Sequence, residues 1–290
     1  MNQPASLPDE DAGGATARDA AQLRAHLLAV HEEAAGFTES CASACRDPEG
    51  RNSYDWLCDA AAPGEGASML DLACGSGVLL ELCRKRYGAE VSLTGLDMSA
   101  AELELAQARL ADARVTLRNG LAQSLDFAAE GSFDAVLCHW ALTLMDPLEP
   151  VLREVARVLK PGGVFAAIVD GPDASATGYA EAGAIIGAHV VKARSDYAEL
   201  GDPRARDGDA LRALAASVFD GADISVETGV FALDDAPERL AEEASGFFYS
   251  AFVLSDDERR AMLKDLAGFF ARQASPRFEM PVNRLVVRAR

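Results

Sequence analysis

The amino-acid sequence predicts an α/β fold: a doubly wound, mostly parallel seven-stranded sheet with a helical cap. Short apolar runs alternate with helical patterns from residue 68 to residue 170. A glycine-rich turn, Asp71–Gly77, follows the first apolar run, and Asp97 ends the second. Because alternation at this spacing requires right-handed crossovers, we expect parallel strands that are covered on both faces.

The N-terminal part is predicted to be a disordered tail followed by a helical lid. Residues 1–18 combine Pro, Gly, Asp and Ala without hydrophobic periodicity, so we expect no regular structure there. Residues 20–37 have apolar side chains at helical spacing, and a second helix is expected over residues 54–61, before a Pro-Gly pair. We therefore predict a lid over residues 19–62, ahead of a sheet domain over residues 63–290.

The sheet domain is expected to begin with strict alternation of strands and helices. In order, the predicted elements are strand 68–72, helix 77–87, strand 91–96, helix 99–111, strand 114–118, strand 133–138, helix 147–159 and strand 163–170.

The pattern changes after residue 170, where Ala- and Gly-rich helices fill residues 173–200. The elements expected after them are helix 209–219, strand 223–231, helices 236–251 and 256–272, and strand 283–288. The segments at about 173–205 and 236–272 are predicted to form a cap over the strand ends.

The turn at Asp71–Gly77 is the main candidate for a binding motif. Glycines allow close approach of a ligand to the backbone, and Asp97, twenty residues after Gly77, is placed to bind ribose hydroxyls. A dinucleotide fingerprint needs a third glycine where this chain has Leu80, and Asp71 would repel a pyrophosphate, so an NAD-dependent oxidoreductase is disfavoured. Asp71 instead suits the ammonium group of an amino acid. A cofactor that is both nucleoside and amino acid fits best, which points to S-adenosylmethionine.

Four segments in register resemble the motifs of a known family. They are Asp71–Gly77, Asp97–Ser99, Phe133–Cys138 and Arg157–Phe165. Over residues 50–171 the chain resembles the class I S-adenosylmethionine-dependent methyltransferases, of the type that acts on small molecules. The resemblance implies a Rossmann-like methyltransferase fold whose last strand inserts antiparallel. It also implies a set of cofactor-binding residues: Asp71, Ala73, Gly75, Gly77, Asp97, Met98, Leu121, Ala122, Gln123 and Cys138.

Two of these positions depart from the family pattern. Ala73 stands where the family has its first glycine, and we expect alanine to permit the turn. Leu121 stands where many relatives carry an acid that accepts a hydrogen bond from the adenine amino group. Leucine cannot accept this bond. Either Gln123 or a backbone carbonyl takes the contact, or adenine is held mainly by apolar packing.

His139 and Tyr54 are the candidate catalytic residues. Ligands of such sheets bind beyond the carboxyl ends of the strands, and His139 directly follows the fourth strand. It could deprotonate a hydroxyl or orient an amine, or it could be a partly buried histidine that only bonds the backbone. Tyr54 in the lid is expected to stabilise the sulfonium through its aromatic face. Arg51 beside it could bind the cofactor's carboxylate.

Composition restricts the partners. The net charge of −19 over 290 residues disfavours nucleic-acid backbones and anionic membrane surfaces, and no apolar run reaches the roughly 20 residues of a membrane span. Six cysteines are scattered without metal-ligand spacing, so no metal is expected. We expect a cytoplasmic monomer or homodimer with a small-molecule substrate.

The leading functional hypothesis is in-line methyl transfer to a small molecule, as in secondary metabolism. The alternative keeps the cofactor but cyclises its aminobutyrate part to azetidine-2-carboxylate, with release of methylthioadenosine. A third hypothesis is a cofactor-binding protein without catalysis. The intact set of Asp71, Gly75, Gly77 and Asp97 argues against this third hypothesis.

Overall fold

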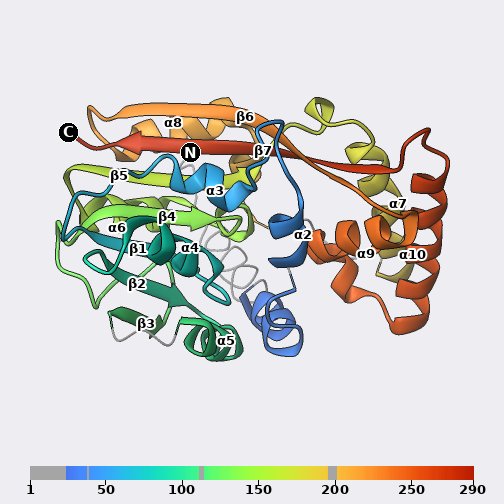
Figure 1. The fold of residues 1–290 in the computed structure, drawn as a ribbon, viewed down its shortest axis with the longest axis horizontal. Helices are drawn as coiled ribbons and strands as arrows, with labels where there is room; N and C mark the ends of the chain where they lie inside the picture. The colour runs from blue at the N-terminus through green and yellow to red at the C-terminus, as the bar shows by residue number, and fades with distance from the viewer. Residues whose placement is uncertain (1–23, 38, 111–113, 195–200) are drawn as a thin grey trace, which may run out of the picture.

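The computed structural model describes residues 24–37, 39–110, 114–194 and 201–290. The predicted tail at residues 1–18 therefore lies outside the described residues. Within them, seven strands form one sheet in the order β3-β2-β1-β4-β5-β7-β6 (Figure 1). The strands are β1 (Ser68–Leu72), β2 (Ser92–Asp97), β3 (Val115–Asn119), β4 (Phe133–His139), β5 (Leu159–Asp170), β6 (Asp223–Asp234) and β7 (Arg277–Arg288).

The sheet is parallel except at one edge. Strands β1 to β5 pair in parallel, whereas β7 inserts between β5 and β6 and is antiparallel to both. The predicted α/β fold and the antiparallel last strand are confirmed. Chain order reverses between β1 and β4, which are neighbours in the sheet, so their carboxyl ends form the switch point where ligands of such folds bind.

Helices cover both faces because successive strand residues point to opposite sides. In β4, Ala135 and Leu137 join the hydrophobic cluster that includes α3, α4 and α5, whereas Val136 and Cys138 join the cluster under α6 and α8. These helices are α3 (Ser53–Cys58), α4 (Val78–Tyr87), α5 (Ala100–Leu110), α6 (Glu149–Val158) and α8 (Gly208–Val218). The strands of this double-sided core consequently read as continuous apolar runs.

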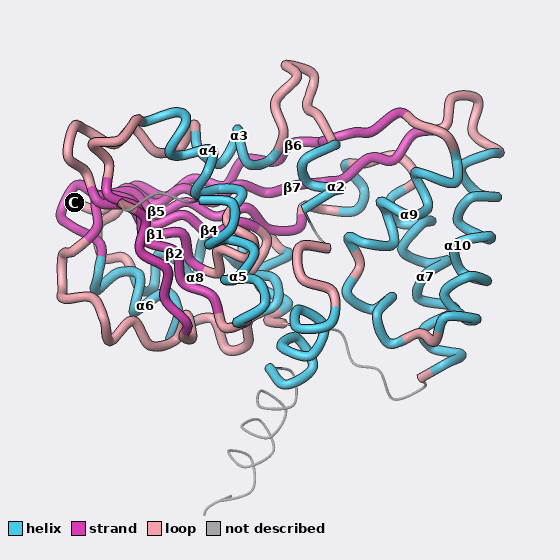
Figure 2. Tube along the Cα trace, turned by 60° about the horizontal axis from the view of Figure 1, so that its bottom comes forward, coloured by secondary structure: helices cyan, strands magenta, loops and turns pink. Residues whose placement is uncertain are grey.

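A helical lobe lies beside the sheet. It contains α7 (Tyr179–Ala193), α9 (Pro237–Phe247), the 3-10 turn η4 (Tyr249–Val253) and α10 (Asp256–Ala271), and α10 packs against both α7 and α9. Figure 2 shows β6 and β7 running out of the sheet toward this lobe.

The extended part of β6 and β7 was not predicted from the sequence. Strand β7 pairs with β5 only from Val282 onward, but with β6 along its whole length, so the remaining residues form a two-stranded arm. The sequence pattern predicts this strand only over residues 283–288. Burial of Phe278 and Met280 against the lobe stabilises the arm, and this contact is long-range in sequence.

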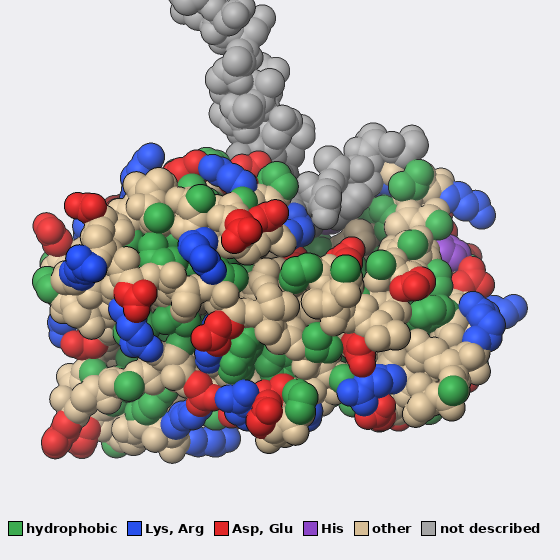
Figure 3. Space-filling model, turned by 90° about the horizontal axis from the view of Figure 1, so that it is seen from above, with side chains coloured by type: hydrophobic (Ala, Val, Ile, Leu, Met, Phe, Trp, Pro, Cys, Tyr) green, Lys and Arg blue, Asp and Glu red, His purple; other side chains and the backbone are tan. Residues whose placement is uncertain are grey.

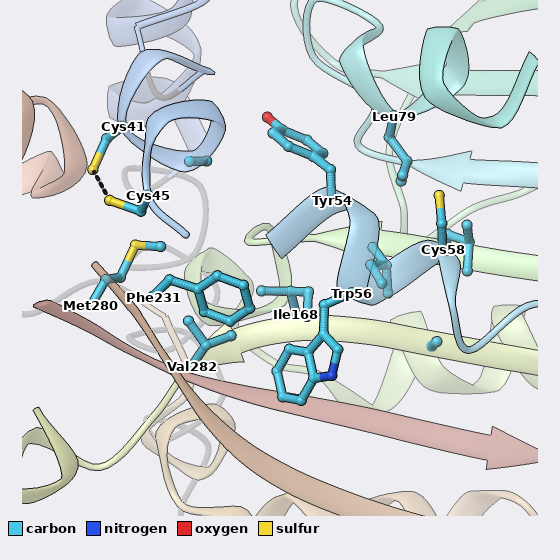
Figure 4. Close-up of a cluster of buried hydrophobic side chains, with 14 of the residues drawn as sticks. Cys41, Cys45, Tyr54, Trp56, Cys58, Leu79, Ile168, Phe231, Met280 and Val282 are labelled. Atoms are coloured by element: carbon cyan, nitrogen blue, oxygen red, sulfur yellow. Dashed lines mark hydrogen bonds between the residues drawn. The ribbon is translucent and has the colours of Figure 1, made fainter. Parts of the chain in front are cut away.

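The N-terminal segments lie between the sheet domain and the lobe (Figure 1). They comprise a lid helix at residues 24–33 and α2 (Glu39–Ala44), whereas α3 lies over the sheet. Figure 4 shows that Trp56 and Tyr54 leave α3 on different sides, with Trp56 beside Phe231 and Ile168. The guanidinium of Arg284 lies 4.5 Å from the Trp56 ring centroid and donates a hydrogen bond to the backbone carbonyl of Trp56. Trp56 thus anchors α3 on the sheet.

Candidate functional site

The glycine turn between β1 and α4 has left-handed backbone at three positions. Gly75 has φ 48°, Gly77 has φ 82°, and Ala73 has φ 61°. A left-handed alanine costs about 1–2 kcal/mol, which glycine at this position would not incur. A Cβ on Gly77 would lie 3.1 Å from the Cβ of Ala106. Gly77 therefore serves the packing of α4 on α5, whereas the turn before it faces a cavity.

Two buried aspartates border this turn, with opposite hydrogen-bonding states. Asp97 Oδ2 accepts from the amide of Gly75 at 2.8 Å, and its Oδ1 accepts from the amide of Ser99 at 2.9 Å. Both carboxylate oxygens of Asp71 are buried and have no partner among the described residues. Burial, reinforced by the charge of Asp97, raises the pKa of Asp71 well above its ordinary value. A cationic ligand would supply the partner that Asp71 lacks.

The cavity opens at the carboxyl ends of the parallel strands, as the switch point predicts. Ten of the twelve site residues expected from the sequence line it: Asp71, Ala73, Gly75, Asp97, Met98, Leu121, Ala122, Gln123, Tyr54 and His139. Gly77 and Cys138 do not line it. The Cys138 side chain is fully buried in the core on the α6 and α8 side of the sheet, where burial raises its thiol pKa to about 12. The Cys138 side chain thus packs in the core and does not line the cavity.

Tyr54 and His139 are stacked on each other at the end of β4. Their ring centroids lie 3.7 Å apart at an interplanar angle of 20°. His139 Nε2 lies 2.9 Å from the hydroxyl of Ser53, the first residue of α3. Burial lowers the pKa of His139 to about 3, so its ring is neutral at physiological pH. Burial also raises the pKa of Tyr54, which keeps its hydroxyl protonated.

Arg51 does not reach the cavity. Its guanidinium bonds Asp47 at 2.8 Å and Asp59 at 2.9 Å, and it also lies near Glu49. These acids hold Arg51 on the outside of α3. The suggestion that it binds a cofactor carboxylate is therefore wrong.

Acidic side chains dock the lid on the sheet domain. Glu39 Oε2 accepts from the Ser76 hydroxyl at 2.8 Å, and both Glu39 oxygens accept from Arg109 at 2.7 Å. Glu32 Oε1 accepts from the Ser99 hydroxyl at 3.0 Å, at the start of α5. These bonds hold the lid against the glycine turn, and they join residues too distant in sequence for any local pattern to reveal.

Several cavity residues were not predicted from the sequence, and three of them are polar side chains that bond one another. Glu102, His31 and Tyr249 line the cavity from α5, the lid helix and the lobe. Glu102 shares the buried face of α5 with Ala106 and Leu110. An acid on the apolar stripe of an amphipathic helix was a readable signal.

Trp140 lines the cavity as well, with φ 60° and a buried indole N–H that has no partner. Such a φ is strained for a bulky residue, and strained residues concentrate at functional sites. Trp140 is not among the twelve site residues expected from the sequence. Its backbone strain could not be read from the sequence.

A family model described as "Methyltransferase domain" matches residues 70–167, which run from β1 to β5. These residues contain the glycine turn, Asp97 and the end of β4. Residues 70–167 thus match a methyltransferase domain, in agreement with the family resemblance of the sequence. S-adenosylmethionine is the cofactor of this domain type. Asp71, which lacks a partner, fits the ammonium group of this cofactor, and Asp97, which accepts from the Gly75 amide, fits its ribose. The glycine turn leaves room for its sulfur-bearing chain.

Curated relatives match this methyltransferase domain and not the whole chain. The arsenite methyltransferase of Aquipseudomonas alcaligenes is 36% identical over 117 residues, which cover 37% of this chain and 34% of that protein. The ubiquinone biosynthesis O-methyltransferase of Alkalilimnicola ehrlichii is 32% identical over 145 residues, covering 46% and 58%. The chain thus spans at most about three fifths of these relatives.

Solved structures share the fold over a longer stretch. The YcgJ protein of Bacillus subtilis has a TM-score of 0.56 at 15% identity, covering 82% of this chain and 98% of that one. Phosphoethanolamine N-methyltransferase 2 of Haemonchus contortus, solved with S-adenosylhomocysteine, has a TM-score of 0.53 at 19% identity, covering 84% and 53%. At these identities the likeness concerns the fold alone.

Within the described ranges, no helix combines the length and apolar character needed to cross a bilayer. The same ranges contain no cluster of three or more His, Cys, Asp or Glu side chains that could hold a metal ion.

Proposed function

We propose that this protein is an S-adenosylmethionine-dependent methyltransferase that acts on a small molecule enclosed between its sheet domain, lid and lobe. The main observation is the state of Asp71, a buried carboxylate at the glycine turn with both oxygens unpartnered. An uncompensated buried charge is costly, so a cationic ligand group is the natural partner. The matching methyltransferase domain supports S-adenosylmethionine as the molecule that provides it.

The cofactor, when bound, supplies a methyl group on a positively charged sulfur. Because this group is already activated, the protein has to align the acceptor and exclude water. Asp71 would bind the ammonium group and Asp97 the ribose hydroxyls. Met98 and the segment Leu121–Gln123 would hold the adenine, and Tyr54 would present its aromatic face to the sulfonium.

His139 is proposed to position the acceptor rather than to take its proton. A ring with a pKa of about 3 is a weak base at neutral pH. Its Nε2 is already engaged with Ser53, and its face is covered by Tyr54. This arrangement fixes the orientation of the ring, so that Nδ1 is the atom available for hydrogen bonding to a ligand.

A small acceptor is favoured because the lid and the lobe both contribute walls to the cavity, through His31 and Tyr249. On the face seen in Figure 3, basic and acidic side chains are interspersed, which offers no continuous basic track for a nucleic-acid backbone. Of the two relatives described above, one is named as an arsenite methyltransferase and the other as an O-methyltransferase of ubiquinone biosynthesis. The shared domain accordingly does not fix the acceptor.

Calorimetric titration with S-adenosylhomocysteine tests the cofactor site. We expect the wild-type chain to bind this ligand. Asp97→Ala should lower the affinity at least tenfold, because the ribose hydroxyls lose their acceptor. Equal affinity of the two proteins would refute the ribose assignment.

The reaction is tested by incubating the chain with S-adenosylmethionine alone and then with candidate acceptors. Methyl transfer predicts adenosylhomocysteine only when an acceptor is present. The matched methyltransferase domain and relatives favour this outcome over cyclisation of the cofactor. Methylthioadenosine formed without an acceptor would overturn the proposal.

A further inference from the structure

Glu102 is a buried acid on the first turn of α5, and it is only 2% exposed. The buried face of α5 otherwise carries Ala106 and Leu110, so the position is one where an apolar side chain would suffice. Burying a carboxylate is costly unless each of its oxygens finds a donor. The partners of Glu102 therefore indicate what this residue is for.

One oxygen of Glu102 is fully engaged by the lid. Oε1 lies 2.7 Å from His31 Nδ1 and accepts from the amide of Gly36 at 2.9 Å. The other ring nitrogen of His31, Nε2, lies 2.9 Å from the hydroxyl of Tyr249 in the lobe. A chain of hydrogen bonds thus runs from α5 through the lid to the lobe.

Aromatic packing reinforces this connection. The ring of Phe37 lies 5.1 Å from that of Tyr249 and 4.3 Å from that of Phe252, while His31 is 5.4 Å from Phe37. The end of the lid helix is therefore packed into the lobe at the point where it bonds Glu102.

The other oxygen of Glu102 has no partner among the described residues. Oε2 is buried, and it lies 3.6 Å from the position that a Cβ on Gly75 would occupy. Gly75 is the residue of the glycine turn whose amide bonds Asp97, and both Gly75 and Glu102 line the cavity. Oε2 therefore faces the place where the backbone of the turn admits a ligand.

We propose that Glu102 is a further cofactor-binding residue, whose Oε2 accepts a hydrogen bond from a ligand donor beside Gly75 and whose Oε1 holds the lid. The inference rests on the proposed function, because the donor is taken to be an O–H or N–H group of S-adenosylmethionine, from its ribose or its ammonium. Binding of the cofactor then gives both carboxylate oxygens of Glu102 a hydrogen-bond donor. It also couples the occupied site to the lid and the lobe through His31.

Glu102→Gln tests the contact, and Glu104→Gln is the matched control, because Glu104 is an exposed acid on the same helix. In calorimetric titrations, Glu102→Gln is expected to bind S-adenosylhomocysteine at least tenfold more weakly than wild type. Glu104→Gln is expected to stay within twofold. Equal affinities for all three proteins would overturn the proposal.

Methylthioadenosine distinguishes the two possible donors, because it retains the ribose and lacks the ammonium. If Glu102→Gln weakens both ligands equally, the donor is a ribose hydroxyl. If it weakens only S-adenosylhomocysteine, the donor is the ammonium. A wild-type chain that binds neither ligand would refute the proposed function itself, and this inference with it.

Hydrogen exchange tests the coupling. In the wild-type chain, S-adenosylhomocysteine at saturation should protect the amides of residues 24–37, and this protection should be smaller in saturated Glu102→Gln. Tyr249→Phe removes only the hydroxyl that bonds His31, so it should reduce lid protection in the ligand-saturated chain. It also serves as the informative variant if Glu102→Gln fails to fold. Unchanged lid protection in both variants would contradict the coupling.

Discussion

Replacing Asp71 by asparagine should stabilise the ligand-free protein and weaken cofactor binding. Both carboxylate oxygens of Asp71 are buried without partners. A buried unsatisfied polar group costs about 1–3 kcal/mol, and more when it is charged. Asparagine leaves an unsatisfied amide but removes the charge, so we expect the free energy of unfolding to rise by about 1–2 kcal/mol at pH 8. For a chain of this size that is a rise in Tm of about 2–6 °C.

The sign of the pH dependence follows from the raised pKa. Burial, with the nearby Asp97, raises the folded-state pKa of Asp71 above its unfolded value. The stability that the raised pKa contributes is therefore fully present below the unfolded pKa of Asp71, and it is lost as the pH rises through the folded pKa. The advantage of Asp71→Asn should consequently be larger at pH 8 than at pH 5.

Bound S-adenosylhomocysteine should reverse the order of stability, so that the wild-type chain becomes more stable than Asp71→Asn. At a concentration of 100 Kd, a ligand stabilises the wild-type chain by about 2.7 kcal/mol. If Asp71→Asn binds about 100-fold more weakly, the same concentration adds only about 0.4 kcal/mol. Thermal unfolding with and without S-adenosylhomocysteine, at pH 5 and pH 8, measures these effects.

Asp134→Asn is the matched control for this series. Asp134 accepts from the amide of Ser68 at 2.8 Å and from Lys160 at 2.7 Å. Burial alone would raise the pKa of Asp134, but these bonds outweigh it and lower the pKa. Because the pair is about one third exposed, its removal should cost less than about 1 kcal/mol. The reasoning fails if Asp71→Asn is less stable than wild type at pH 8 without ligand, or if it binds S-adenosylhomocysteine equally well.

Three further predictions concern the site and the packing around it. His139 should produce no limb in the pH–rate profile between pH 5 and 8, because its pKa is about 3; a limb near pH 6.5 that disappears in His139→Gln would contradict its neutral, positioning role. Gly95→Ala should lower the free energy of unfolding by about 1–3 kcal/mol, because its Cβ would lie 2.7 Å from Leu80 Cδ1. Gly187→Ala, in an open position of α7, should instead raise it by about 0.5–1 kcal/mol, and urea denaturation of both variants compares the two. Ala73→Gly should keep the fold and bind S-adenosylhomocysteine at least as well as wild type, because it relieves a left-handed alanine; a loss of affinity above threefold by calorimetry would count against the strain assigned there.

The sheet domain could be predicted from the sequence because its signals are local. The apolar runs, the turn at Asp71–Gly77 and the acid at Asp97 lie within single strand–turn–helix units. Their order implies parallel crossovers, and hence the switch point where the cavity lies. His139 could be placed at the cavity for the same reason, since it is defined by the end of its own strand.

The protonation and orientation of the same residues could not be predicted. The pKa of His139 is lowered by its burial, and its ring is oriented by Tyr54 and Ser53, which come from α3. The resemblance implied Cys138 as a cofactor-binding residue, but the structure places its side chain in the core on the α6 and α8 side of the sheet. Arg51 stood beside Tyr54 in sequence, but its acidic neighbours hold it outside.

The sequence by itself determined the α/β fold, the glycine-rich turn and the acids that flank it, because each depends on periodicity and spacing within a short segment. Only the tertiary structure decided that Asp71 is left without a partner and that Glu102 faces the turn. It alone joined His31 and Tyr249 across 218 residues. The physical reason is that desolvation and hydrogen-bond satisfaction depend on every element packed around a group, and these elements come from distant parts of the chain.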